Sequence, residues 1–205
     1  NRLGLCHLEQ KNYNAALSNF ERALEINPNQ IEPLSNKGLT FYKKNDFKKA
    51  KEVFLKVLSL DSEYIEAINN LGRVYTAMGL PDNAIEILSS KLKSNADNPK
   101  LLSCLVDAYA RQQSYIEALD CCKKVIDLEG DTASALNSLG HLYHKIGDYE
   151  KAEINFKKAH KLDKNFSRAL VNLSILKHDN GYYLEAEELM NSILAKEPDR
   201  KDVKN

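Results

Sequence analysis

Residues 136–159 read LNSLGHLYHKIGDYEKAEINFKKA, and this stretch decides the fold. Apolar and small side chains recur three or four positions apart on both sides of Gly147-Asp148, which is the spacing of one face of an α-helix. Glycine readily adopts the left-handed backbone that ends a helix, and aspartate accepts hydrogen bonds from the N–H groups that begin the next one. We therefore predict a first helix over about 133–146 and a second helix that begins after Asp148.

The same pattern returns every 34 residues, most strictly as an alanine at Ala16, Ala50, Ala84, Ala118, Ala152 and Ala186. Twelve positions before this alanine the chain has Gly4, Gly38, Gly72, Val106, Gly140 and Ser174, and four positions after it Phe20, Phe54, Leu88, Cys122, Phe156 and Met190. A fixed period of this length is typical of a repeat array. We predict that glycine and alanine let the two helices approach closely and that stacking of neighbouring hairpins completes the core.

These residues divide the chain into repeats of approximately 1–30, 31–64, 65–98, 99–132, 133–166 and 167–200, with 201–205 as the start of a truncated further helix. We predict that 1–205 is a single array. Because the chain opens part-way through a repeat, we also expect it to be a fragment of a longer protein.

The pattern resembles the tetratricopeptide repeat (TPR) family. The match includes a Leu-Gly pair followed three residues later by tyrosine, the alanine column, and a proline between repeats, as at Leu71-Gly72 with Tyr75, Leu139-Gly140 with Tyr143, Pro28 and Pro198. The resemblance covers essentially the whole chain. It implies an all-α fold, namely an α-solenoid in which antiparallel helix hairpins form a right-handed superhelix. It also implies that a protein or peptide partner binds in a concave groove lined by the first helix of each repeat.

Two repeats depart from the pattern. In the third repeat, Lys91 stands in a column that is otherwise apolar, and Ser94 stands where other repeats have leucine. We predict that the second helix of this repeat is frayed or displaced at its end. In the sixth repeat, Lys177 stands in an aromatic column and Ser174 in the glycine column. Such changes are expected of a terminal repeat with one face in water.

The composition argues against several classes of function. The chain has 29 basic and 29 acidic residues, so its formal net charge of zero disfavours a nucleic-acid binder and an electrostatic membrane anchor. No run of apolar residues is long enough for membrane insertion. The cysteines have no zinc-ligand spacing, and we interpret them as small apolar residues of a reducing, cytoplasmic compartment, at positions Cys6, Cys104, Cys121 and Cys122.

On the repeat frame, the residues expected to line the groove, and so to bind a partner, are Asn36, Leu39, Tyr42, Asn69, Asn70, Arg73, Asp107, Arg111, Asn137, His141, His144 and Asn172. Side-chain amides both donate and accept, so they can hold a peptide backbone without reading its sequence. The asparagines at 36, 70 and 172 share one column, which is similar to the asparagine ladder in the TPR region of O-GlcNAc transferases. Cys104 and Ser138 interrupt that column.

Two other site types are disfavoured. The two-carboxylate clamp of chaperone-binding TPRs needs an arginine four residues after Lys100, where this chain has Cys104, and the Lys100 column holds Glu32 and Glu66 in the preceding repeats. Those carboxylates would repel an acidic tail. His141 and His144 lie three apart and could begin a metal site, but no further ligand is evident on that face. We interpret them as polar residues of a binding surface and predict no metal and no cofactor.

The sequence shows no nucleophile elbow, phosphate-binding glycine loop or paired carboxylates. We therefore predict a non-catalytic scaffold that binds a peptide or helix of a partner protein. Two alternatives stay open. In the first alternative, the array is the substrate-recruiting arm of a larger enzyme that resembles an O-GlcNAc-type glycosyltransferase. In the second, it is a homo-oligomeric scaffold that self-assembles through the uncapped ends of the array.

Overall fold

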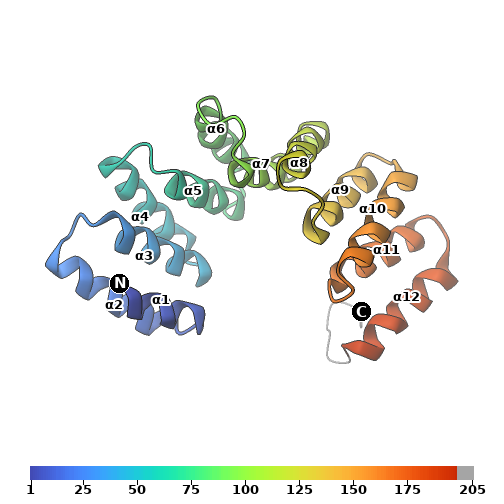
Figure 1. Cartoon of the computed structure of the whole chain (residues 1–205), viewed down its shortest axis with the longest axis horizontal. Coiled ribbons are helices and arrows are strands. Elements are labelled where there is room, and N and C mark those ends of the chain that lie inside the picture. Colours follow the sequence, from blue (N-terminus) through green and yellow to red (C-terminus); the bar gives the residue numbers. More distant parts are fainter. Residues whose placement is uncertain (198–205) are drawn as a thin grey trace. The chain divides into compact units, whose positions relative to one another are not determined.

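The computed structural model describes residues 1–197, which form twelve α-helices and no strand within that range (Figure 1). The helices fall into two compact parts, an N-terminal unit of Asn1–Gln112 and a C-terminal unit that begins at Gln113. Pro198 and the helix start predicted for 201–205 lie outside the described residues. The single array over 1–205 stays a prediction.

The N-terminal unit is built from three helix hairpins and one further helix. Each hairpin pairs one first helix with one second helix, and each second helix also packs on the first helix of the next repeat. The first helices of neighbouring repeats contact one another, as α3 does α5 and α5 does α7. The helices are α1 (Arg2–Glu9), α2 (Tyr13–Ile26), α3 (Ile31–Lys43), α4 (Phe47–Leu60), α5 (Ile65–Ala77), α6 (Pro81–Leu92) and α7 (Pro99–Gln112).

The C-terminal unit repeats this arrangement. Helix α8 packs on α9, the hairpins α9–α10 and α11–α12 stack through α10 and α11, and α9 also contacts α11. The helices are α8 (Tyr115–Glu129), α9 (Ala133–Lys145), α10 (Tyr149–Leu162), α11 (Ser167–Asp179) and α12 (Tyr183–Lys196). The first helix predicted for about 133–146 is thus confirmed to within one residue.

A residue with left-handed backbone lies in the turn between the two helices of every repeat, with φ of +59° at Lys11, +61° at Asn45, +74° at Gly79, +67° at Gln113, +83° at Gly147 and +81° at Gly181. In the fifth repeat, the carboxylate of Asp148 then accepts a hydrogen bond from the N–H of Lys151 at 3.2 Å. Asn12 and Asp46 cap their helices in the same way. The predicted turn and cap are therefore confirmed.

The close approach predicted between the two helices of a hairpin is also confirmed. A Cβ atom placed on Gly140 would lie 2.7 Å from ring carbons of Phe156, and those on Gly4 and Gly38 would lie less than 3.0 Å from the rings of Phe20 and Phe54. These three phenylalanines are 0% exposed. The first helix of the next repeat completes the core of the hairpin, because Leu173 and Leu176 of α11 pack against Ala152 and Phe156.

The two departures from the pattern are accommodated by charge pairs. Helix α6 ends at Leu92, two positions before the end of α4 in repeat register, so it is shortened as predicted. Lys91 is not displaced, however, because it stays buried and forms an ion pair with Glu63. Lys177 likewise does not face water: its Nζ lies 3.0 Å from Glu153 and 2.9 Å from Glu185, so the lysine bridges α10, α11 and α12.

Candidate functional site

Most of the candidate partner-binding residues come from three first helices of the N-terminal unit, α3, α5 and α7, and we term the surface that these helices form the first-helix face. It carries Asn36, Leu39, Tyr42, Asn69, Asn70, Arg73, Asp107 and Arg111. The remaining candidates lie on α9 and α11 of the C-terminal unit, at Asn137, His141, His144 and Asn172.

Arg73 is the centre of the first-helix face. Its guanidinium carbon lies 4.8 Å from the ring centroid of Tyr42 on the neighbouring helix, which is a cation–π contact. Its Nη1 donates to the amide oxygen of Asn70 at 3.5 Å, a long bond. Arg73 is nevertheless exposed, and its guanidinium carries further N–H donors. The arginine is held in place and remains able to bind an acceptor.

Asp107 and Arg111 extend this face along α7, and both are exposed. Although Asp107 is open to water, desolvation by the protein around it raises the pKa of its carboxyl, and the charges of Arg73 and Arg111 oppose that rise. Cys104, one turn earlier, is buried, and desolvation raises its thiol pKa to about 11. The thiol is therefore a protonated packing group and not a nucleophile.

The amides on this face are less open than the sequence predicts. Asn36 donates to the side chain of Asn1 at 3.1 Å. The amide oxygen of Asn69 is buried and has no hydrogen-bond partner within residues 1–197, and its backbone carbonyl accepts from the thiol of Cys104. Leu39 packs against the two neighbouring apolar clusters. These residues are therefore engaged within the chain, whereas Arg73 is exposed and Tyr42 and Asn70 are half-buried.

In the C-terminal unit, the amide of Asn172 donates to the amide oxygen of Asn137 at 2.8 Å. Asn137 is only 7% exposed, so it lies beneath the surface and does not line it as expected. Its polar side chain suggested exposure, but the bond between α9 and α11 explains why a polar residue is needed there. Cys104 interrupts the asparagine column, and Asn36 and Asn172 of that column are already hydrogen-bonded within the chain. The described residues therefore do not form a continuous row of free amides.

The two histidines have different surroundings. Desolvation, followed by the charges of Lys145 and His144, lowers the pKa of the exposed His141, so this side chain is neutral near pH 7 and can donate or accept. The Nε2 of His144 lies 3.1 Å from Oδ2 of Asp179 on α11, and the His144 ring packs on Tyr149. Across the described residues, no three His, Cys, Asp or Glu side chains are grouped so as to hold a metal ion.

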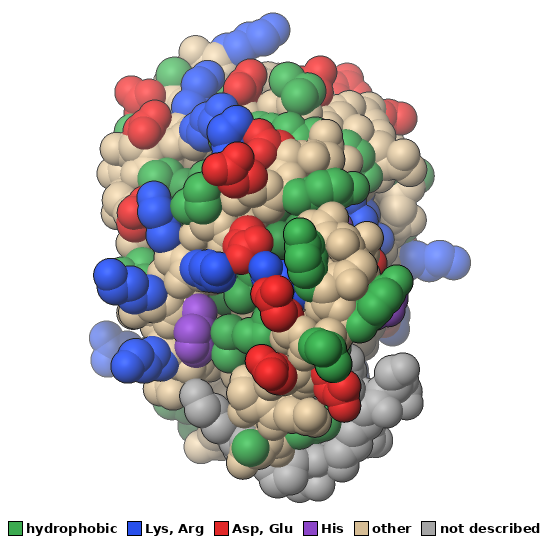
Figure 2. Space-filling view, turned by 90° about the vertical axis from the view of Figure 1, so that its right-hand side faces the viewer, with side chains coloured by type: hydrophobic (Ala, Val, Ile, Leu, Met, Phe, Trp, Pro, Cys, Tyr) green, Lys and Arg blue, Asp and Glu red, His purple; other side chains and the backbone are tan. Residues whose placement is uncertain are grey.

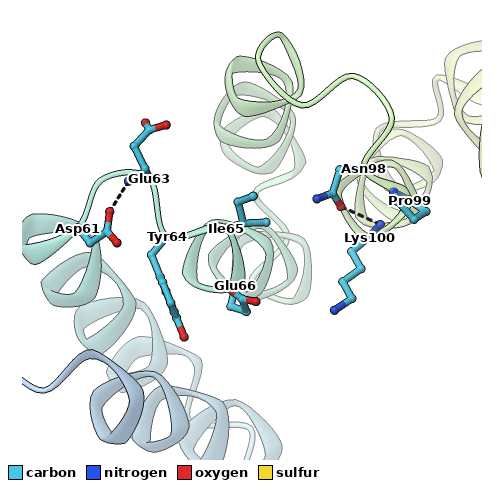
Figure 3. A pocket seen from close by; sticks show the side chains of 8 residues that line it. All are labelled: Asp61, Glu63, Tyr64, Ile65, Glu66, Asn98, Pro99 and Lys100. Atoms are coloured by element: carbon cyan, nitrogen blue, oxygen red, sulfur yellow. Dashed lines mark hydrogen bonds between the residues drawn. The ribbon is translucent and has the colours of Figure 1, made fainter.

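Sequence reasoning missed a cavity of about 440 Å³ in the N-terminal unit, at the start of α5 and of α7 (Figure 3). Glu66 on α5 and Lys100 on α7 lie on two sides of it, with Asp61, Glu63 and Tyr64 from the preceding loop. Desolvation and then the charge of Glu66 raise the pKa of the Tyr64 hydroxyl. The sequence contained a signal for this cavity. Glu66 and Lys100 stand 34 residues apart, so they occupy the same repeat position on neighbouring first helices.

Three family models, each described as tetratricopeptide repeat, match residues 1–30, 41–105 and 97–165. The chain belongs to the tetratricopeptide repeat family. A search of the curated proteins finds no match to this sequence.

Solved structures show the same fold. The crystal structure of PilW, a widely conserved type IV pilus biogenesis factor, is similar with a TM-score of 0.90 and 17% identity over 99% of this chain and 94% of that chain. The TPR protein TTC0263 of Thermus thermophilus has a TM-score of 0.73 and 24% identity, over 85% and 95%. A structure of MamA has a TM-score of 0.66 and 27% identity, over 82% and 97%. The all-α, TPR-type solenoid class predicted from the sequence is confirmed.

A TPR array is generally a protein-interaction scaffold without catalysis of its own. None of the helices in the described part of the chain has the length and apolar character needed to span a membrane.

Proposed function

We propose that this chain is a non-catalytic scaffold whose array spans residues 1–205 and which binds a peptide or helix of a partner protein on the first-helix face of the N-terminal unit. The observation that carries the proposal is Arg73. Its guanidinium packs on the ring of Tyr42, and this contact leaves the arginine exposed. A side chain pre-positioned in this way loses less conformational entropy when it binds, so it contributes more affinity than a free surface arginine.

The chemistry of this face fits an extended or helical peptide of mixed charge. Arg73 and Arg111 offer donors to carboxylate or backbone carbonyl groups, while Asp107 between them accepts from an amide or a cation. Tyr42 adds an aromatic surface at low entropic cost. We further propose that the C-terminal unit has a recognition residue of its own in His141, which is a neutral donor and acceptor.

The alternative of a substrate-recruiting arm of a glycosyltransferase was based partly on the asparagine column at 36, 70 and 172. Because Asn36, Asn137 and Asn172 are hydrogen-bonded within the chain, the geometry does not favour it. The scaffold proposal needs only Tyr42 and the charged side chains.

The test is a selection of peptides from a displayed random library, followed by affinity measurements on purified variants by fluorescence anisotropy. We expect Arg73→Ala to weaken binding of the selected peptides by about tenfold or more, as for a central arginine contact. Arg22→Ala is the matched control, because Arg22 is an exposed arginine on second helix α2. The melting temperature should change little in either variant. Peptides that bind Arg73→Ala and Tyr42→Ala as tightly as the original chain would show that this face is not the binding site.

A further inference from the structure

The turn between α3 and α4 carries more positive charge than the turn inside any other repeat. Residues 42–49 hold four lysines and one acid, whereas the same window of the other repeats holds at most two lysines or arginines. The four lysines are exposed, at Lys43, Lys44, Lys48 and Lys49. Figure 2 faces the side where Figure 1 draws α10 to α12, and there basic and acidic side chains share one face. The excess charge is therefore a feature of the second repeat.

The acid of this turn neutralises only one of its lysines. Asp46 accepts from the N–H of Lys49 at 3.3 Å through Oδ1, and its Oδ2 lies 3.0 Å from the Nζ of the same lysine. Both carboxylate oxygens are thus engaged. Lys43 and Lys48 form no ion pair or hydrogen bond through their side chains within residues 1–197. Glu52 follows Lys48 by one helical turn on α4 but does not pair with it.

The first repeat adds to this charge. The Nζ of Lys44 donates to the amide oxygen of Asn14 at 2.8 Å, which joins the start of α2 to the α3–α4 turn without neutralising the ammonium group. Lys11, at the left-handed position of the first turn, is exposed and forms no ion pair in the described part of the chain. We term the lysines without an acidic partner the lysine cluster, namely Lys11, Lys43, Lys44 and Lys48.

Packing does not account for the lysine cluster. The position of Lys48 holds asparagine, aspartate, isoleucine, glutamate and leucine in the other repeats, so no shared contact requires a lysine there. Ammonium groups gathered in one turn repel one another, and a bound anion reduces that repulsion. The cluster therefore fits an anionic partner by charge complementarity.

The surroundings of the cluster favour carboxylates over a phosphate backbone. The cluster holds no arginine, which is the side chain that binds phosphate in a bidentate way. The rings of Tyr42 and Phe47 beside the turn pack on each other with centroids 5.7 Å apart, and Tyr42 also contacts Arg73, so they are not free to stack on bases. Affinity for DNA grows with the number of phosphates neutralised, and this cluster offers few such contacts.

An aliphatic side chain is exposed on the neighbouring turn, between α5 and α6. Helix α4 adjoins this part of the chain, because the Nζ of Lys51 lies 6.0 Å from the ring centroid of Tyr75. The carbonyl of Tyr75 in turn accepts from the N–H of Leu80 at 2.9 Å, and Leu80 is 40% exposed. The acid of that turn, Asp82, is hydrogen-bonded to Gln112. The third turn thus offers an apolar contact next to the charge of the second.

We propose that the lysine cluster and Leu80 form a docking surface for an acidic segment of a partner protein. That segment carries a run of aspartate or glutamate followed by an aliphatic residue. Its carboxylates pair with the ammonium groups of the cluster, and its aliphatic residue packs on Leu80. This surface goes beyond the first-helix face, because its residues come mainly from the turns and from the start of α4.

The probe is a fluorescent oligoglutamate peptide that ends in leucine, EEEEEEL, added to the whole chain at low ionic strength. We expect saturable binding by fluorescence anisotropy, weakened by added salt. The triple variant Lys43→Gln, Lys44→Gln and Lys48→Gln should weaken binding by about tenfold, because exposed ion pairs each contribute little and three are removed. Its melting temperature should not fall, since the substitutions remove like charges.

Two comparisons test whether position matters. A control variant removes the same total charge elsewhere, at lysines that are exposed and form no ion pair among residues 1–197, through Lys56→Gln, Lys93→Gln and Lys158→Gln. It should change binding by less than about twofold, because these charges lie outside the cluster. Leu80→Ser should weaken EEEEEEL by about two- to fivefold and leave the weaker peptide EEEEEES unchanged, since only the first loses an apolar contact.

The proposal is overturned if EEEEEEL does not bind, if the two triple variants have equal effects, or if Leu80→Ser affects both peptides alike. Oligothymidine or phosphatidylserine vesicles that bind more tightly than EEEEEEL, and lose binding in the Lys43, Lys44 and Lys48 variant, would assign the cluster to phosphate groups instead. Self-association in sedimentation that this variant abolishes would assign it to a second copy of the chain.

The inference and the proposed function can fail independently. Arg73→Ala should change binding of EEEEEEL by less than about twofold, because the arginine lies outside the docking surface. If Arg73→Ala weakens EEEEEEL and the lysine variant does not, the acidic segment binds the first-helix face and the inference is wrong, while the proposed function stands.

Discussion

The contact between Gly140 and Phe156 predicts a specific pattern of mutational coupling. A methyl group added by Gly140→Ala would lie 2.7 Å from two carbons of the Phe156 ring and 3.2 Å from the carbonyl oxygen of Ala152. The ring cannot move away, because it is 0% exposed and packs against α11. Overpacking of this kind costs about 1–3 kcal/mol, and the better helix propensity of alanine returns about 1 kcal/mol. We expect a net loss of up to about 2 kcal/mol and a fall in melting temperature of up to about 8 °C.

The sixth repeat supplies the compensating change. There Ser174 stands in the glycine column, and its hydroxyl lies 3.3 Å from the sulfur of Met190, which replaces the phenylalanine. We expect Gly140→Ser and Phe156→Met each to destabilise the chain, and the double variant to be more stable than the sum predicts by about 1 kcal/mol or more. Urea unfolding followed by circular dichroism measures the coupling.

A turn variant is the control for this cycle. A methyl group added at Gly147 meets no atom within 4 Å, so its cost comes from the backbone at φ +83° and should add to that of Phe156→Met without coupling. If Gly140→Ser and Phe156→Met are also simply additive, the steric explanation of the glycine column is wrong.

Three further predictions concern turns and charges. Gly147→Ala should lower the free energy of unfolding by about 1 kcal/mol. Lys11→Gly should raise it by about 0.5–1 kcal/mol, because Lys11 has a φ of +59° at the same turn position. Thermal melts measure both changes, and a loss of stability in Lys11→Gly would contradict the backbone argument. A side-chain hydrogen bond from Lys151 lowers the pKa of Asp148 below its ordinary 3.8, so its stabilising effect is present above that pH and lost as pH falls through the depressed value. Asp148→Asn, which keeps the cap acceptor, should therefore show a smaller loss of stability on acidification below pH 3.8 in urea titrations; an unchanged acid dependence would refute this. Lys91→Met should raise the urea midpoint by the equivalent of about 1 kcal/mol, since an apolar side chain replaces a buried cation, and a lower midpoint would mean that the pair with Glu63 contributes more than its desolvation costs.

The repeat core could be predicted from the sequence because each of its contacts joins residues at a fixed offset. Gly140 meets Phe156 sixteen positions later, as Gly38 meets Phe54, so one contact explains a whole column. The turn at Gly147 and the cap at Asp148 are local, so a few adjacent residues define them. Such features need no knowledge of the neighbouring repeats.

Two of the contacts that were missed, those of Lys91 and Lys177, join residues off this register. Lys91 pairs with Glu63 from a loop 28 positions earlier, where no column points to it. Lys177 was expected in water because it replaces an aromatic, but its position lies between α10 and α12, where two carboxylates receive it. Asn137 was placed on the surface by its polarity alone, whereas its bond to Asn172 buries it. Polarity predicts exposure only when no partner lies within hydrogen-bonding distance.

A repeat array also separates residues needed for packing from residues available for recognition. The column of alanines is uniform because every repeat makes the same contact there. The column that contains Arg73 reads Leu5, Leu39, Arg73, Asp107, His141 and Ile175, so it holds five different residue types in six repeats. No shared packing contact can require five different side chains. We therefore expect a partner to be recognised through the exposed Arg73 and Asp107 of this column more than through the more uniform asparagines.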